Sequence, residues 1–78
     1  MDSATRLFYL DEHTLMVVTP KGKIKLLHTP FRVKCIKEAD RLKPGRLYLV
    51  EKVKGKGNLI FFTINRFVYP HSLFLVPE

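Results

Sequence analysis

The sequence is poor in the residues that cross-link small secreted proteins or form reactive centres. It contains one cysteine, Cys35, and no tryptophan. A single cysteine cannot form an internal disulfide, whereas a secreted domain of this size normally carries several. We therefore expect the chain to occupy a reducing compartment, the cytoplasm. Because Cys35 shares an alternating face with Phe31 and Val33, it is expected to be a small buried hydrophobic residue rather than a reactive thiol.

Long hydrophobic runs are also missing. The longest apolar stretches, such as residues 15–18 and 59–62, are far shorter than the ~20 residues of a membrane-spanning helix. The opening residues MDSATR lack the basic and then apolar start of a secretory signal. We expect a soluble chain without a membrane partner, and its 78 residues suffice for a single domain, residues 1–78.

Groups that could carry catalysis are few and scattered. The chain has seven Asp and Glu residues, and the acidic pairs at 11–12 and 38–40 lie in predicted turns, where such side chains usually face solvent. The three histidines and Cys35 lack the spacing of zinc ligands. Residues 55–57, Gly-Lys-Gly, lack the wider glycine spacing of a phosphate-binding loop. The sequence therefore predicts no enzyme, no cofactor, no metal site and no small-molecule substrate.

Positive charge is abundant and unevenly placed. The net charge is +7. Residues 21–66 hold thirteen Lys and Arg against three acidic residues, which gives +10, whereas the two ends together hold one Arg against four acidic residues, which gives −3. A polyanion such as RNA or DNA could recognise this asymmetry.

Short alternating stretches separated by turn signals dominate the chain. The predicted strands cover residues 6–10, 14–19, 23–28, 31–36, 46–53, 58–64, 67–69 and 73–76. Residues 36–42 are the only stretch with helical character, and they suffice for one helical turn or an ordered loop. This pattern predicts an all-β fold, a small antiparallel barrel or curled sheet of about five to seven strands, with at most one short helical turn near 36–42.

The second half of the chain resembles the Src homology 3 barrels. Residues 40–50, DRLKPGRLYLV, look like the diverging turn and the following strand of that family, and residues 69–76, YPHSLFLV, are similar to its short helical turn and last strand. The resemblance implies the barrel shape. It does not carry over the binding of proline-rich peptides, because the chain has no tryptophan and its N-terminal hairpin lacks the acidic loop that binds them.

Two predicted strands are apolar on both faces. Residues 59–64 place two apolar side chains on one face and three on the other, and residues 73–76 are apolar throughout. A strand of this kind is usually covered on both sides. Either the N-terminal hairpin folds over the second face, or a second copy or another protein covers it. The sequence thus allows a protein-interaction module or assembly subunit that uses strands 59–64 and 73–76.

Basic side chains recur at every second position and could form a nucleic-acid-binding surface. Side chains two residues apart on a strand point to one face, at ~6.6 Å intervals. If strand 31–36 pairs with strand 23–28, their basic rows would form one patch beside aromatic residues, as in single-strand binders. The candidate binding residues are Lys21, Lys23, Lys25, Arg32, Lys34, Lys52, Lys54 and Lys56, with Tyr48 or Tyr69 stacking on a base. The alternative is that these lysines are only the solvated face of a sheet.

Overall fold

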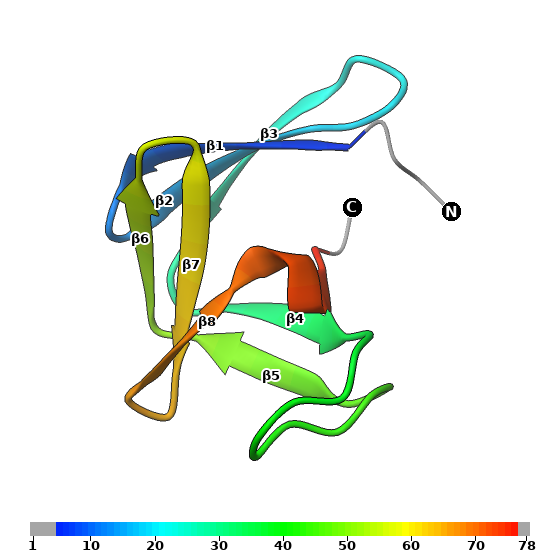
Figure 1. Ribbon diagram of the computed structural model, residues 1–78. Coiled ribbons are helices and arrows are strands. Elements are labelled where there is room, and N and C mark those ends of the chain that lie inside the picture. Colours follow the sequence, from blue (N-terminus) through cyan, green and yellow to red (C-terminus); the bar gives the residue numbers. More distant parts are fainter. Residues whose placement is uncertain (1–4, 77–78) are drawn as a thin grey trace.

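Three small antiparallel sheets surround one apolar core in the computed structural model, which describes residues 5–76 (Figure 1). The first sheet has the strand order β1-β2-β3, the second β5-β4-β9 and the third β6-β7-β8. In chain order the described elements are β1 (Arg6–Asp11), β2 (Thr14–Val18), β3 (Ile24–His28), β4 (Phe31–Cys35), β5 (Leu47–Val50), β6 (Lys52–Lys56), β7 (Leu59–Ile64), β8 (Phe67–Pro70), the 3-10 turn η1 (His71–Leu73) and β9 (Phe74–Leu75).

The first sheet is a meander in which β2 pairs with both of its neighbours. The core side of β2 carries Leu15 and Val17, which are fully buried. Because side chains alternate along a strand, Met16 points to the other side, together with its cross-strand partners Phe8 and Leu26. The register therefore determines which side chains lie on the outer side of the first sheet.

The second and third sheets share one bent strand. β5 and β6 are separated only by Glu51, whose backbone N–H still bonds to a carbonyl of β7 at 2.8 Å. Gly57, at φ +60°, and Asn58 form the two-residue loop between β6 and β7, as in a type II′ turn. Asn65 and Arg66, both at positive φ, form the loop between β7 and β8, as in a type I′ turn. These tight loops fix the register of the third sheet.

Phe62 of β7 lies at the centre of the core. Its side chain is fully buried, and its ring packs edge-on against Phe31 and tilted against Phe74, with centroid distances of 5.7 and 5.9 Å. The other buried hydrophobic residues are Leu15, Val17, Val33, Cys35, Leu42, Val50, Val53, Ile60 and Ile64. All three sheets contribute to this core, and the predicted burial of Cys35 is confirmed.

The N-terminal hairpin packs on the core side of the third sheet. The ring of Tyr9 lies against Gly55, where a Cβ atom would come within 2.7 Å of it. Gly55 pairs with Ile60, which faces the core, so this contact covers the buried side of β7. On the opposite side of β7, Leu59 is exposed, whereas Phe61 and Thr63 are half-buried. Only one side of this doubly apolar strand is therefore covered by the hairpin.

The fold is all-β, as the sequence predicts, but the details differ. The described residues form nine strands rather than five to seven, because each predicted segment forms a strand and the segment 46–53 divides at Glu51 into β5 and β6. Among these residues the three ladders do not close into a barrel. The helical turn lies at His71–Leu73 rather than near 36–42. That segment is a loop closed by a bridge between Ala39 and Leu42, because Arg41 adopts a φ of +67°, outside the right-handed helical range.

Candidate interaction surfaces

The outer side of the first sheet is apolar across all three strands. The registers place Phe8, Met16 and Leu26 in one row across the sheet and Val18 and Ile24 in the next row. Ile24 is 65% exposed, Leu26 53% and Phe8 41%, and the side chains of the central strand are half-buried between them. Contiguous exposed apolar surface marks interaction sites more often than it marks an ordinary monomer surface. We call these five residues the first-sheet face.

Charged groups border the first-sheet face at its two ends, and the ends differ in sign. Arg6 begins β1, and Lys21 and Lys23 lie in the β2–β3 turn at the same end of the sheet. Asp11 ends β1 and Glu12 begins the β1–β2 turn at the opposite end. The first-sheet face thus has a basic end, an apolar centre and an acidic end.

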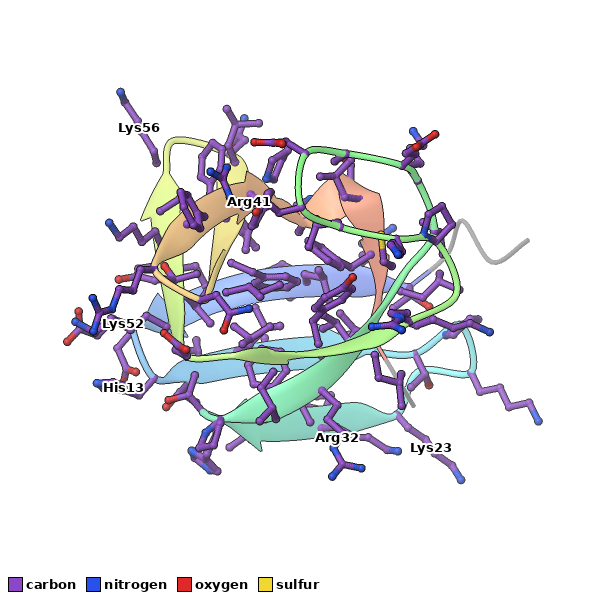
Figure 2. All side chains as sticks on the ribbon, turned by 90° about the horizontal axis from the view of Figure 1, so that it is seen from below. His13, Lys23, Arg32, Arg41, Lys52 and Lys56 are labelled. Carbon is purple, nitrogen blue, oxygen red and sulfur yellow. The ribbon has the colours of Figure 1, made fainter. Side chains whose placement is uncertain are left out.

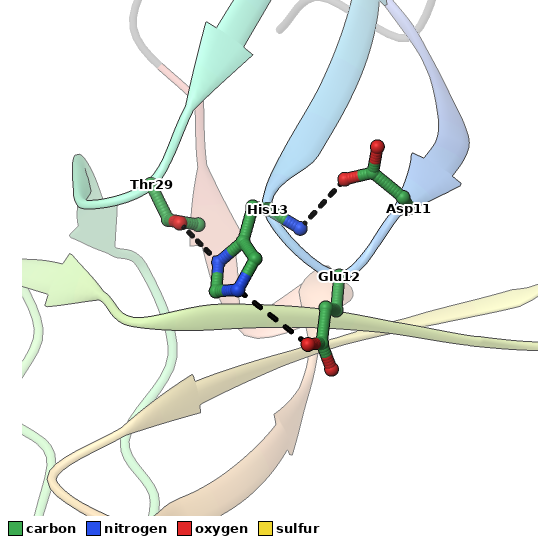
Figure 3. A network of polar contacts seen from close by, with 4 residues as sticks. All are labelled: Asp11, Glu12, His13 and Thr29. Atoms are coloured by element: carbon green, nitrogen blue, oxygen red, sulfur yellow. Dashed lines mark hydrogen bonds and ion pairs between the residues drawn. The ribbon is translucent and has the colours of Figure 1, made fainter.

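A polar network around His13 organises the acidic end (Figure 3). The backbone N–H of His13 donates to Oδ1 of Asp11 at 2.8 Å. A 2.8 Å hydrogen bond joins Nδ1 of His13 to Oγ1 of Thr29, and Nε2 lies 3.5 Å from Oε1 of Glu12. The backbone N–H of Thr29 also donates to the His13 carbonyl at 2.9 Å. Two hydrogen bonds therefore join the β1–β2 turn to the corner between β3 and β4.

The order hydroxyl, imidazole, carboxylate in this network is also that of a hydrolytic triad. The His13 and Glu12 side chains are 57% and 58% exposed, however, so the groups lie in water at the tip of a turn. The Glu12 carbonyl accepts a 2.7 Å hydrogen bond from the backbone N–H of Val53, which ties the same turn to β6. These hydrogen bonds therefore hold the β1–β2 turn against the neighbouring segments of the fold. Sequence spacing could not reveal it, because His13 and Thr29 are 16 residues apart.

The charge of Asp11 is expected to make stability depend on pH in acid. The backbone N–H of His13 is the main group that lowers the pKa of Asp11 below its usual value of 3.8. The ionised carboxylate therefore stabilises the fold above about pH 4, and this contribution is lost as the pH falls through the lowered pKa. Asp11→Asn keeps the acceptor but removes the charge. It should be slightly less stable than the wild type at neutral pH and equally stable in strong acid, as measured by urea denaturation; a pH-independent difference would contradict this.

The predicted nucleic-acid-binding residues are distributed over three surfaces. Lys21 and Lys23 lie in the β2–β3 turn, Lys25 on β3, Arg32 and Lys34 on β4, and Lys52, Lys54 and Lys56 on β6, all of them exposed. Figure 2 shows Lys23, Arg32, Lys52 and Lys56 spread around the molecule rather than gathered on one side. The condition for a single patch, pairing of strand 31–36 with strand 23–28, is not met, because β3 pairs with β2, and β4 pairs with β5 and β9. The basic rows of β3 and β4 therefore belong to different sheets.

The most regular basic row lies on the outer side of the third sheet. Lys52, Lys54 and Lys56 alternate with the inward-facing positions of β6, and their partners on β7 are Thr63, Phe61 and Leu59. This row therefore combines three cations with an apolar neighbour strand.

Both tyrosines proposed for stacking make structural contacts within the fold. Tyr48 lies on the core side of β5, and its hydroxyl accepts a 2.9 Å hydrogen bond from the backbone N–H of Lys43. Tyr69 packs edge-on against Phe74, with centroids 6.3 Å apart, and its hydroxyl donates to the Asp40 carbonyl at 3.3 Å. Both rings are half-buried against the core. Their contacts position the loop between β4 and β5.

The outer side of the second sheet mixes charge with apolar side chains. Arg32 pairs with Leu49, and Lys34 pairs with Leu47 on one side and with Leu75 on the other. All three leucines are more than half exposed. This surface is amphipathic, in contrast to the apolar first-sheet face.

The two strands predicted to be apolar on both faces lie in different sheets. β7 exposes Leu59 on the third sheet, and β9 exposes Leu75 on the second. The larger apolar surface, the first-sheet face, could not be inferred from the sequence. Residues 24–28, IKLLH, fit either orientation, and only their pairing with β2 decides which side chains point outward.

The chain matches no protein-family model, and no curated protein or solved structure shows significant similarity to it. Residues 5–76 contain no helix long and apolar enough to cross a lipid bilayer. In the same part of the chain, no three His, Cys, Asp or Glu side chains gather as a metal site.

Proposed function

We propose that the protein is a non-catalytic assembly subunit that associates with a second copy of itself through the first-sheet face. The observation that carries this proposal is the apolar row Phe8, Met16 and Leu26, which is continuous across three strands and exposed at both edges. Removing an exposed Leu or Phe side chain from water contributes ~1.5–3 kcal/mol. Two sheets packed face to face would bury this row in both copies.

The charges at the ends of the first-sheet face favour a second copy as its occupant. A two-fold axis in the interface and perpendicular to the strands places the basic end of one copy over the acidic end of the other. Arg6 and Lys21 would then face Asp11 and Glu12 at the rim, while apolar side chains meet in the centre. Rim charges of this kind set orientation more than affinity. No charge is buried at the centre of such an interface.

The expected association is weak and reversible. Three strands and five residues span about 10 by 13 Å between Cα atoms. This is smaller than the ~800 Å² per partner of a standard stable interface. The net charge of +7 on each copy also opposes association. A dissociation constant in the micromolar to millimolar range follows.

Sedimentation equilibrium tests the proposed function directly. The weight-average mass should rise from one chain at low micromolar concentration towards two chains near millimolar concentration. The rise should persist at high salt, because apolar burial is not screened. A single-chain mass over the whole range would overturn the proposal.

The lysine row of β6 favours a second candidate function, weak contact with RNA or DNA. Three lysines repeat on one face, and their partners on β7 add no negative charge. Fluorescence titration of labelled single- and double-stranded oligonucleotides should then give an affinity that falls with salt, with a log–log slope of about −2 to −3 for three phosphate contacts.

Two triple variants distinguish oligonucleotide binding by the lysine row of β6 from binding by the overall positive charge. Replacing Lys52, Lys54 and Lys56 with glutamate should remove oligonucleotide binding. The matched reversal of Lys21, Lys23 and Lys25 changes the net charge equally and should largely retain it. Equal losses in both variants, or no binding by the wild type at low salt, would reject the β6 row as the site.

A further inference from the structure

A cleft of about 640 Å³ opens between β1, β7 and the end of β9. Its innermost side chains are apolar: Ile60 and Phe74 are buried, and Leu7 is half-buried beside them. Leu47 and Leu75, both exposed, continue the apolar lining to the rim. Volumes of this size hold small organic ligands, and an apolar lining with a few polar groups is typical of such sites.

Charge in the cleft is of one sign. Among the described residues that line it, Lys34 is the only Lys, Arg, Asp or Glu. Its cross-strand neighbours Leu47 and Leu75 flank it on both sides, so its aliphatic stem runs between leucines and its ammonium lies at the rim. No described acidic residue forms an ion pair with Lys34. The ammonium group is thus available to an anion from outside the chain.

The polar groups of the cleft are neutral hydrogen-bonding groups. Burial lowers the pKa of His71 below its usual value of 6.5, so its imidazole is uncharged at neutral pH. Ser72 and Asn58 add a hydroxyl and an amide. These groups can bond to oxygen atoms without repelling an anion. The cleft therefore offers an apolar interior and a cationic rim.

We propose that this cleft binds an aliphatic carboxylate. The hydrocarbon chain would lie against Leu7, Ile60 and Phe74, and the carboxylate would pair with Lys34 at the rim. Lys34 selects an anion over a neutral or cationic molecule of equal length. Leu7 points to the core side of the first sheet, opposite to the first-sheet face, so this site is separate from the proposed self-association surface.

Three probes of equal chain length test the site: decanoate, 1-decanol and decyltrimethylammonium. Each probe is added to the isotopically labelled full chain, with the protein kept at a concentration too low for self-association. The amide chemical shifts are then followed by NMR. Decanoate should bind saturably, with shifts centred on the amides of Leu7, Ile60 and Phe74. It should bind about three- to fivefold more tightly than decanol, because a partly exposed ion pair contributes up to ~1 kcal/mol.

Substitutions at the rim test the role of the ammonium group. Lys34→Gln should reduce decanoate affinity to that of decanol and leave decanol binding unchanged. Lys54→Gln, at another exposed lysine on the third sheet, is the matched control and should keep the preference. Leu47→Asp places a carboxylate opposite Lys34 at an exposed position and should weaken decanoate binding.

Three results would overturn the site: no saturable binding of decanoate, equal affinity for all three probes, or shifts centred on the first-sheet face. None of them bears on self-association, which is measured without ligand.

Discussion

Replacing Leu26 with aspartate is expected to abolish detectable self-association and leave the chain folded. Leu26 lies in the central apolar row, is 53% exposed and packs on Met16 across the strand pair, so the fold does not depend on its burial. In a two-fold interface the substitution occurs twice. Losing two leucine contacts removes at least ~3 kcal/mol, which corresponds to about 100-fold weaker association.

Leu59→Asp is the matched control for this prediction. Leu59 is 59% exposed at the start of β7, the central strand of the third sheet, away from the first-sheet face, and its replacement by aspartate changes the charge in the same way. Sedimentation equilibrium of both variants at matched concentrations should give a single-chain mass for Leu26→Asp and wild-type association for Leu59→Asp. Equal loss in both would show that association depends on general surface hydrophobicity, and the assignment to the first sheet would fail.

Phe62→Ala is expected to cause the largest loss of stability. The Phe62 ring is fully buried between Phe31 and Phe74, so its removal leaves a cavity where the sheets meet. Such truncations lower the free energy of unfolding by ~3–5 kcal/mol. The whole free energy of unfolding of a small domain is only about 5–15 kcal/mol. The urea midpoint at low protein concentration should fall by more than half, or the chain should be unfolded without urea.

Phe67→Ala supplies the control for the loss of a phenyl ring. Phe67 is 43% exposed on β8, with the Arg41 guanidinium 4.2 Å from its ring centroid. Its truncation removes a cation–π contact and should cost only about 0.5–1 kcal/mol. A similar loss for both phenylalanines would contradict the placement of Phe62 at the centre of the core.

The strand positions follow closely from the sequence, because local alternation and turn residues determine them. The loop at Asn65 and Arg66 lies between the predicted strands 58–64 and 67–69, whereas β6 extends to Lys56, beyond the predicted end at residue 53, so that the loop before β7 contains only Gly57 and Asn58. The bend at Glu51 could not be predicted, since residues 46–53 contain no glycine or proline that would interrupt a strand. It arises because one continuous strand serves two sheets, which is a property of the tertiary fold.

The candidate surfaces were harder to predict, because they depend on which strands pair. A basic patch from β3 and β4 required these strands to be neighbours, and they lie in separate sheets. Tyr48 and Tyr69 have suitable chemistry for stacking, but their hydroxyls bond to the backbone of the β4–β5 loop. The Lys34 cleft combines residues far apart in the chain, so local sequence patterns carry no signal for it, whereas the first-sheet face lies within residues 8–26 and depends on the register of three successive strands.

Amide NMR spectra of the wild type over a concentration series test the central claim most directly, because they show where two copies meet. Shifts that grow with concentration should centre on Phe8, Met16 and Leu26, with smaller changes at Arg6 and Asp11 where the charged ends face each other. The amides of β6 and the outer side of β7 should stay unchanged. Concentration-dependent shifts centred on β6 and β7, or none at all up to millimolar concentration, would contradict self-association through the first-sheet face.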